Sequence, residues 1–100
     1  IAFLGLAYKA DINDLRESPA VRITQTIALD NTISVLIVEP YIQSLPDQLA
    51  KLNNVRLVEL ETAYEDADLI VLLTDHTLFH ERPPEPNDKQ KIIDTRGIWR

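Results

Sequence analysis

Four side chains, three of them in one polar segment near the start of the sequence, could bind an anionic ligand. The apolar run of residues 1–8 ends at Tyr8 and is followed by Lys9, and Arg16 lies further along the same segment. A lysine supplies a point charge and an arginine a planar fork of donors, so Lys9 and the distant Arg96 could together clamp a phosphate. Tyr8 could stack on a base or a sugar. This pattern predicts a binding site for a nucleotide-like anion.

Each of these side chains also has an ordinary structural interpretation. Lys9 could be a solvated surface charge, and Tyr8 could be a half-buried packing residue. Arg16 has acidic neighbours, and on pattern alone a local ion pair of little energetic value is the better interpretation. Arg96 could pair with Asp94.

Alternating apolar runs and amphipathic segments predict the elements that position these side chains. Strand-like runs and segments of helical spacing follow one another along the chain. The strands are expected at 1–8, 33–38, 55–60, 69–73 and 91–94, and the helices at 19–29, 45–52, 61–67 and 77–81. This alternation predicts an α/β fold, a Rossmann-like three-layer sandwich with a mostly parallel five-stranded sheet in the order 3-2-1-4-5.

The carboxyl ends of the strands are the edge at which an open α/β sheet binds its ligands. The segments expected there are 8–18, 39–40, 74–76 and 95–97. Lys9 and Arg96 therefore share one edge of the predicted sheet. Ser18 and Pro19 suit the start of a helix, whose free N–H groups add a weak anion site.

Other polar residues at this edge are less suggestive of chemistry. Glu39 lies where a Rossmann fold places the acid that binds a ribose, but the turn at residues 5–8 reads GLAY, without the G-x-G-x-x-G fingerprint. NAD is therefore not expected in the usual crevice, and Glu39 is interpreted as a strand-end residue. His76 and His80 lack metal-ligand partners at useful spacing, so a cap or surface position is preferred to a zinc site. No nucleophile–base pair emerges, so no catalytic residue and no metal ligand is expected.

The composition narrows the class of protein and its partners. A chain of 100 residues with 45% hydrophobic residues predicts one domain with a modest core. A formal net charge of −6 argues against a nucleic-acid or anionic-membrane partner. With no cysteine, a reducing cytoplasm is the default location. The first residue is an isoleucine inside a strand-like run, so the chain is expected to be the tail of a longer protein.

The opening motif goes further, because it is similar to that of a known family. GLAYKADINDLRESPA at residues 5–20 closely resembles the segment that opens the C-terminal, UDP-binding domain of the UDP-glucose/GDP-mannose dehydrogenase family. The resemblance continues through VEP at 38–40, LLTDH at 72–76 and D-x-R-G-x-W-R at 94–100, in the right order. The resemblance implies that residues 1–100 are the last part of a three-domain enzyme that oxidises a sugar C6 alcohol to a carboxylate while reducing two NAD.

The resemblance also implies roles for individual residues. Tyr8, Lys9 and Arg96 match positions that contact the UDP-sugar, and Arg16 matches an arginine that reaches across the cleft toward NAD. Ile12 stands where several relatives have threonine or serine, so the resemblance carries no hydroxyl contact to that position. The catalytic cysteine of the family belongs to a part outside this chain, so the resemblance implies that the chain alone is inactive.

The implied substrate and partners follow from the same resemblance. The wording LRESPA and the ending GIWR look most like family members that act on UDP-N-acetyl-D-mannosamine. NAD would be bound mainly by an N-terminal domain, and a helical central domain would form a homodimer or larger assembly. The alternative is a non-enzymatic nucleotide-sensing or protein-interaction module.

Overall fold

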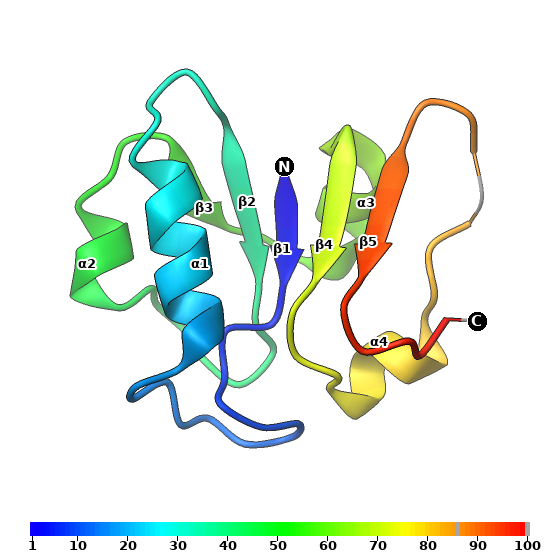
Figure 1. Cartoon of the computed structure of the whole chain (residues 1–100), viewed down its shortest axis with the longest axis horizontal. Helices are drawn as coiled ribbons and strands as arrows, with labels where there is room; N and C mark the ends of the chain where they lie inside the picture. Colours follow the sequence, from blue (N-terminus) through cyan, green and yellow to red (C-terminus); the bar gives the residue numbers. More distant parts are fainter. Residues whose placement is uncertain (86, 100) are drawn as a thin grey trace.

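One parallel sheet of five strands organises the chain (Figure 1). The computed structural model describes residues 1–85 and 87–99; Arg100, the last residue of the D-x-R-G-x-W-R pattern, and Pro86, in the loop expected at 81–88, lie outside the described residues. The strand order is β3-β2-β1-β4-β5, and all four pairings are parallel, which confirms the predicted topology. The strands are β1 (Ala2–Leu4), β2 (Val35–Val38), β3 (Val55–Leu57), β4 (Leu69–Leu72) and β5 (Lys91–Asp94).

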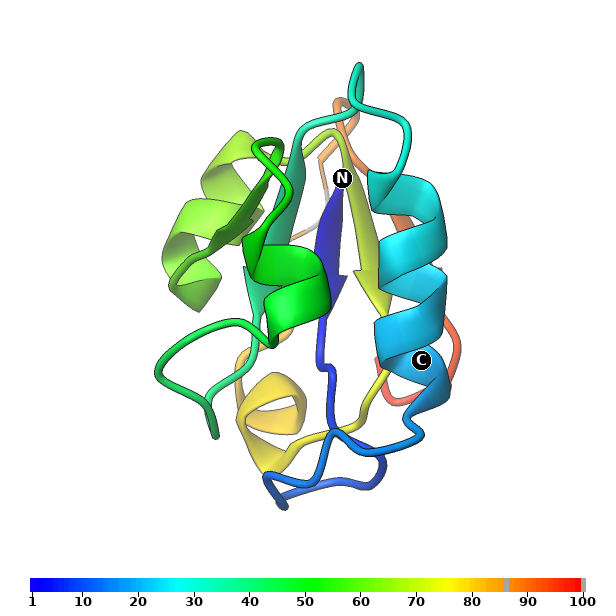
Figure 2. The same ribbon diagram turned by 90° about the vertical axis from the view of Figure 1, so that its left-hand side faces the viewer.

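The helices cover both faces of this sheet, which completes the three predicted layers (Figure 2). On one face lie α1 (Pro19–Ala28) and α2 (Asp47–Ala50), and on the other α3 (Leu60–Asp66). The short α4 (Thr77–Glu81) packs its Phe79 into the same layer as α3, below the carboxyl ends of the strands (Figure 1). None of these helices is long and apolar enough to cross a membrane, as judged over the described residues.

The core consists of two apolar layers separated by the sheet. In β1, Phe3 packs in the α1 layer, whereas Ala2 and Leu4 pack in the α3 layer, as the alternation of strand side chains requires. The three inner strands are apolar almost throughout because both of their faces are covered. β3 and β5 form the two edges of the sheet, which confirms the prediction that the third strand lies at an edge. The residues of β5 are exposed or half-buried.

Several element boundaries differ from the prediction. The first strand ends at Leu4, not at residue 8, because Gly5 has a φ of 97° and the chain leaves the ladder there. Leu60 begins α3 and so does not belong to the third strand. The second helix is only four residues long and starts at Asp47, directly after Pro46.

Candidate functional site

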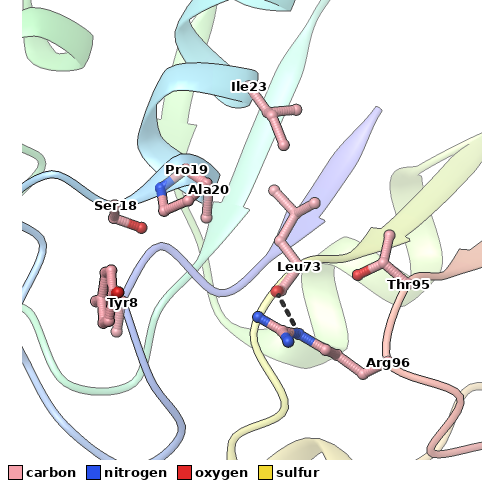
Figure 3. A pocket seen from close by; sticks show the side chains of 9 residues that line it. Tyr8, Ser18, Pro19, Ala20, Ile23, Leu73, Thr95 and Arg96 are labelled. Atoms are coloured by element: carbon pink, nitrogen blue, oxygen red, sulfur yellow. Dashed lines mark hydrogen bonds between the residues drawn. The ribbon is translucent and has the colours of Figure 1, made fainter.

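A pocket opens at the carboxyl ends of β1 and β4, between the first turns of α1 and the turn that follows β5 (Figure 3). Its volume of about 370 Å³ falls within the range of small-ligand sites. Pro19, Ile23 and Leu73 supply apolar walls, and Tyr8 and Arg96 supply the larger polar groups. This is the switch point of the sheet, where parallel α/β folds bind ligands.

Tyr8 and Arg96, which are 88 positions apart in the numbering, therefore meet in one pocket. They come from opposite sides of it, Tyr8 on the loop after β1 and Arg96 on the turn after β5 (Figure 3). Tyr8 is 50% exposed, so a ligand could cover its ring. An aromatic face and a guanidinium across an apolar floor can together hold a flat heterocycle and a phosphate.

Arg96 is held in place through both its side chain and its backbone. Its Nε donates to the carbonyl oxygen of Leu73 at 3.2 Å. The turn that carries it is capped by Asp94, whose Oδ1 accepts the N–H of Arg96 at 3.1 Å and of Gly97 at 2.7 Å, and whose Oδ2 accepts that of Trp99 at 3.0 Å. Burial raises the pKa of Asp94, but these N–H groups outweigh it and lower the pKa overall. Asp94 thus binds the backbone N–H of Arg96, a different contact from the side-chain ion pair considered from the sequence.

Lys9 follows Tyr8 on the same loop and is exposed. It is not among the described residues that line the pocket with Tyr8 and Arg96. The phosphate clamp between Lys9 and Arg96 therefore stays a prediction.

Arg16 lies on a separate hollow formed with Ile12, Leu15 and Pro46. Its Nε and Nη2 donate to the two carboxylate oxygens of Asp14 at 3.1 and 3.3 Å, so the local ion pair expected from the pattern is present. The hydrogen bonds from Arg16 lower the pKa of Asp14, and those to Asp14 raise the pKa of Arg16. The Arg16 side chain is 90% exposed, so the pair leaves it free to bind another anion.

Glu39 turns inward from the end of β2, and the sequence interpretation missed its role. Its Oε1 accepts the backbone N–H of Leu6 at 2.9 Å and of Ala7 at 3.0 Å, and its Oε2 accepts that of Tyr41 at 3.1 Å. Burial raises its pKa, but the hydrogen bonds from His76 and from these N–H groups lower it overall, so the carboxylate is ionised. Glu39 occupies the N–H groups that a dinucleotide-binding turn would offer to a pyrophosphate, so this crevice does not fit NAD.

His76 is fully buried, so the expected surface position is wrong, although it does stand at the N-cap position of α4. Its Nδ1 accepts the N–H of Asp11 at 2.7 Å, and its Nε2 lies 2.8 Å from Oε1 of Glu39. Because Nδ1 accepts a hydrogen bond, the ring proton is on Nε2 and is donated to the carboxylate. The signal in the sequence was the position of Glu39 directly after β2, in VEP, and of His76 in the TDH segment that follows β4.

Two further contacts fix the start of the same loop. Ser18 Oγ donates to the carbonyl oxygen of Leu6 at 2.7 Å, in place of capping α1. Thr74 Oγ1 donates to the carbonyl oxygen of Ala7 at 2.9 Å. A Cβ on Gly5 would lie 2.4 Å from Cβ of Thr74, so only glycine allows the ends of β1 and β4 to approach this closely.

The fold and the pocket define a class, that of Rossmann-like domains with a pocket at the switch point of the sheet and a turn after the first strand that does not fit a dinucleotide. Residues 2–100 match the UDP-glucose/GDP-mannose dehydrogenase family, UDP binding domain. The chain therefore belongs to this family, as the opening motif predicted.

Individual relatives agree with this assignment. Over 99 residues the chain is 46% identical to an NDP-N-acetyl-D-galactosaminuronic acid dehydrogenase of Ralstonia nicotianae, covering 99% of this chain and 23% of the relative. Over 100 residues it is 46% identical to a UDP-N-acetyl-D-mannosamine dehydrogenase of Yersinia pestis, covering 100% and 23%. The chain thus spans about a quarter of the length of the curated relatives it matches.

Solved structures share the fold. A UDP-N-acetyl-mannosamine dehydrogenase from S. aureus superposes with a TM-score of 0.70 at 31% identity, covering 97% of this chain and 22% of that one. A GDP-mannose dehydrogenase from Pseudomonas aeruginosa superposes with a TM-score of 0.74 at 22% identity, covering 97% and 24%. The first supports the family and the second the fold.

Proposed function

We propose that this chain is the UDP-sugar-binding domain of an NAD-dependent nucleotide-sugar 6-dehydrogenase that oxidises UDP-N-acetyl-D-mannosamine to the uronate. The observation that carries the proposal is the pocket at the switch point, where Tyr8 and Arg96 face each other across an apolar floor. The dehydrogenases named among its relatives support the reaction, and the Yersinia pestis relative supports the sugar.

In this proposal the chain binds and orients the substrate and supplies no catalytic residue. Arg96 pairs with the diphosphate, Tyr8 covers the base or the ribose, and Lys9 adds a second positive charge from the loop. The chain has no cysteine for a covalent step. The isolated chain is therefore inactive and binds UDP only weakly, since it forms one wall of the cleft.

The cofactor belongs to another domain of the proposed enzyme. When bound, NAD would supply the hydride acceptor for this reaction. Because Glu39 occupies the backbone N–H groups of Leu6 and Ala7, we expect another domain of the enzyme to hold it. Arg16, exposed on its own hollow, would bind the phosphates of the cofactor in place of Asp14.

The remaining partners follow from the same proposal. This domain works with an N-terminal NAD-binding domain and a central dimerisation domain in a cytoplasmic homodimer or larger assembly. A net charge of −6 leaves nucleic acids and anionic membranes outside its range of partners.

The test is steady-state kinetics of the full-length enzyme. Arg96→Ala should raise KM for the UDP-sugar by about tenfold or more, as expected when a charge-assisted hydrogen bond to a phosphate is lost. Tyr8→Ala and Lys9→Ala should raise it as well. Arg56→Ala removes an exposed arginine from β3, away from the pocket, and is the matched control. A KM unchanged in all three site variants would contradict the assignment of the pocket.

Two further measurements separate the parts of the proposal. Arg16→Ala should impair the use of NAD with little effect on KM for the sugar nucleotide, and unchanged kinetics toward both ligands would remove its role. Comparing kcat/KM for UDP-N-acetyl-D-mannosamine with that for UDP-N-acetyl-D-galactosamine tests the sugar. A preference for the second would overturn the choice of sugar and leave the domain assignment intact.

A further inference from the structure

Tyr8 and Lys9, the two residues of the first loop that are proposed to bind the nucleotide sugar, have side chains with few contacts to the rest of the protein. Tyr8 is half exposed and Lys9 is exposed. Their positions are therefore set by the backbone of residues 6–11. The question is what holds that backbone.

Both ends of this segment are held by one buried pair, Glu39 and His76. At the first end, Oε1 of Glu39 accepts the N–H groups of Leu6 and Ala7 at 2.9 and 3.0 Å. At the second end, Nδ1 of His76 accepts the N–H of Asp11 at 2.7 Å. The ring of His76 joins the two ends, because its Nε2 lies 2.8 Å from the same Oε1.

The pair is protected from competition by water. The side chains of Glu39 and His76 are both fully buried. Tyr41 packs against the imidazole at a centroid distance of 4.9 Å, and Phe79 at 5.6 Å. Hydrogen bonds in such surroundings are stronger than in water, and leaving one unmade is costly.

We propose that Glu39 and His76 are positioning residues for the UDP-sugar site, acting through the backbone of residues 6–11 on Tyr8 and Lys9. The segment that carries these two side chains is hydrogen-bonded at its first and last residues, and the imidazole of His76 connects these two points. The kinetic consequence of this inference rests on the proposed function, whereas the order of the segment does not.

Two substitutions of His76 each remove one of the two hydrogen bonds of the ring and keep the other. The amide of Asn lies near the position of Nδ1, so His76→Asn keeps an acceptor for Asp11 and loses the contact with Glu39. The longer His76→Gln keeps a donor for Glu39 and loses the contact with Asp11. Val35→Ala is the control, because Val35 is fully buried at the opposite end of β2 and touches neither anchor.

In the full-length enzyme, each His76 variant should raise KM for the UDP-sugar about tenfold with kcat within about twofold of wild type, the loss expected for one buried hydrogen bond. Val35→Ala should lower thermal stability and leave KM unchanged. If the His76 variants lose stability like Val35→Ala with an unchanged KM, the pair is only structural and the proposal is overturned. If Arg96→Ala raises KM and the His76 variants do not, the proposed function stands and this inference fails.

A second readout is independent of the substrate. Amide hydrogen exchange of a peptide spanning residues 6–11 should be at least about tenfold faster in both His76 variants than in Val35→Ala. Should the variants not fold, the wild-type enzyme decides alone. Its amides at Leu6, Ala7 and Asp11 should exchange at least about tenfold slower than unprotected amides, and exchange at the unprotected rate would overturn the proposal.

Discussion

Replacing Gly5 by alanine should destabilise the domain strongly, because of where β1 ends. Gly5 has a φ of 97°, a region that side chains with a Cβ rarely adopt. The added methyl carbon would lie 2.4 Å from Cβ and 2.7 Å from Oγ1 of Thr74. Cβ is fixed to the backbone, and the backbone nitrogen of Thr74 lies 2.9 Å away, so a rotamer change cannot relieve the contact and the ends of β1 and β4 must move apart.

The cost can be estimated from two contributions. A positive φ costs an alanine about 1–2 kcal/mol relative to glycine. Displacing Thr74 breaks the buried bond from its Oγ1 to the carbonyl oxygen of Ala7, which costs about 1–3 kcal/mol. Gly5→Ala should therefore lower the free energy of unfolding by about 2–5 kcal/mol, a large share of the stability of a small domain.

Urea denaturation of the chain, followed by the fluorescence of Trp99, measures this quantity, because Trp99 is the only tryptophan and packs in the α3 layer. The matched experiment makes the same substitution in a Thr74→Gly background, where both nearest atoms are absent. The cost there should be smaller but should stay above the about 1–2 kcal/mol of the backbone conformation, because the backbone nitrogen of Thr74 still lies 2.9 Å from the added carbon. A loss below about 0.5 kcal/mol for Gly5→Ala, or an equal loss in both backgrounds, would refute the argument.

Three further predictions concern single carboxylates and a phenol. Asp94→Ala removes the acceptor that holds the turn of Arg96, so KM for the UDP-sugar should rise several-fold in the full-length enzyme. Asp94→Asn should raise KM less. An unchanged KM in both variants would contradict the capping role of Asp94. Burial raises the pKa of Glu39, but hydrogen bonding holds it below the ordinary value of 4.5, so the ionised carboxylate stabilises the folded state above that pH and this stability is lost as the pH falls through the lowered pKa. Urea titrations between pH 3 and 7 should show that the free energy of unfolding depends less on pH in Glu39→Gln than in the wild type. An identical pH dependence would refute the assignment. Burial raises the pKa of Tyr64 from 10.0 to about 12, so the stability of the folded state should fall as the pH rises from 10 to 12. The phenolate absorbance of Tyr64, identified by its loss in Tyr64→Phe, should appear near pH 12. Its appearance near pH 10 would contradict the burial.

The fold could be predicted from the sequence because its signals are local. Apolar runs such as 69–73 and the helical spacing after Pro19 each depend on neighbouring residues, and their alternation leaves few topologies. The pairing of Arg16 with Asp14 was foreseen for the same reason, since the two residues are only two positions apart. The ends of the elements were predicted less well, because the departure of the chain at Gly5 depends on Thr74, which lies far along the sequence.

By itself, the sequence determined the strand order, the family and the loop in which a ligand site had to be sought. Only the tertiary structure decided that Tyr8 and Arg96 line one pocket while Arg16 lies on another surface. It also decided that Glu39 and His76 point inward, since their contacts with residues 6–11 join segments 32 to 65 positions apart. The physical reason is burial: a carboxylate and an imidazole on strand ends look equally able to bind a ligand or the backbone, and the packing around them selects the backbone.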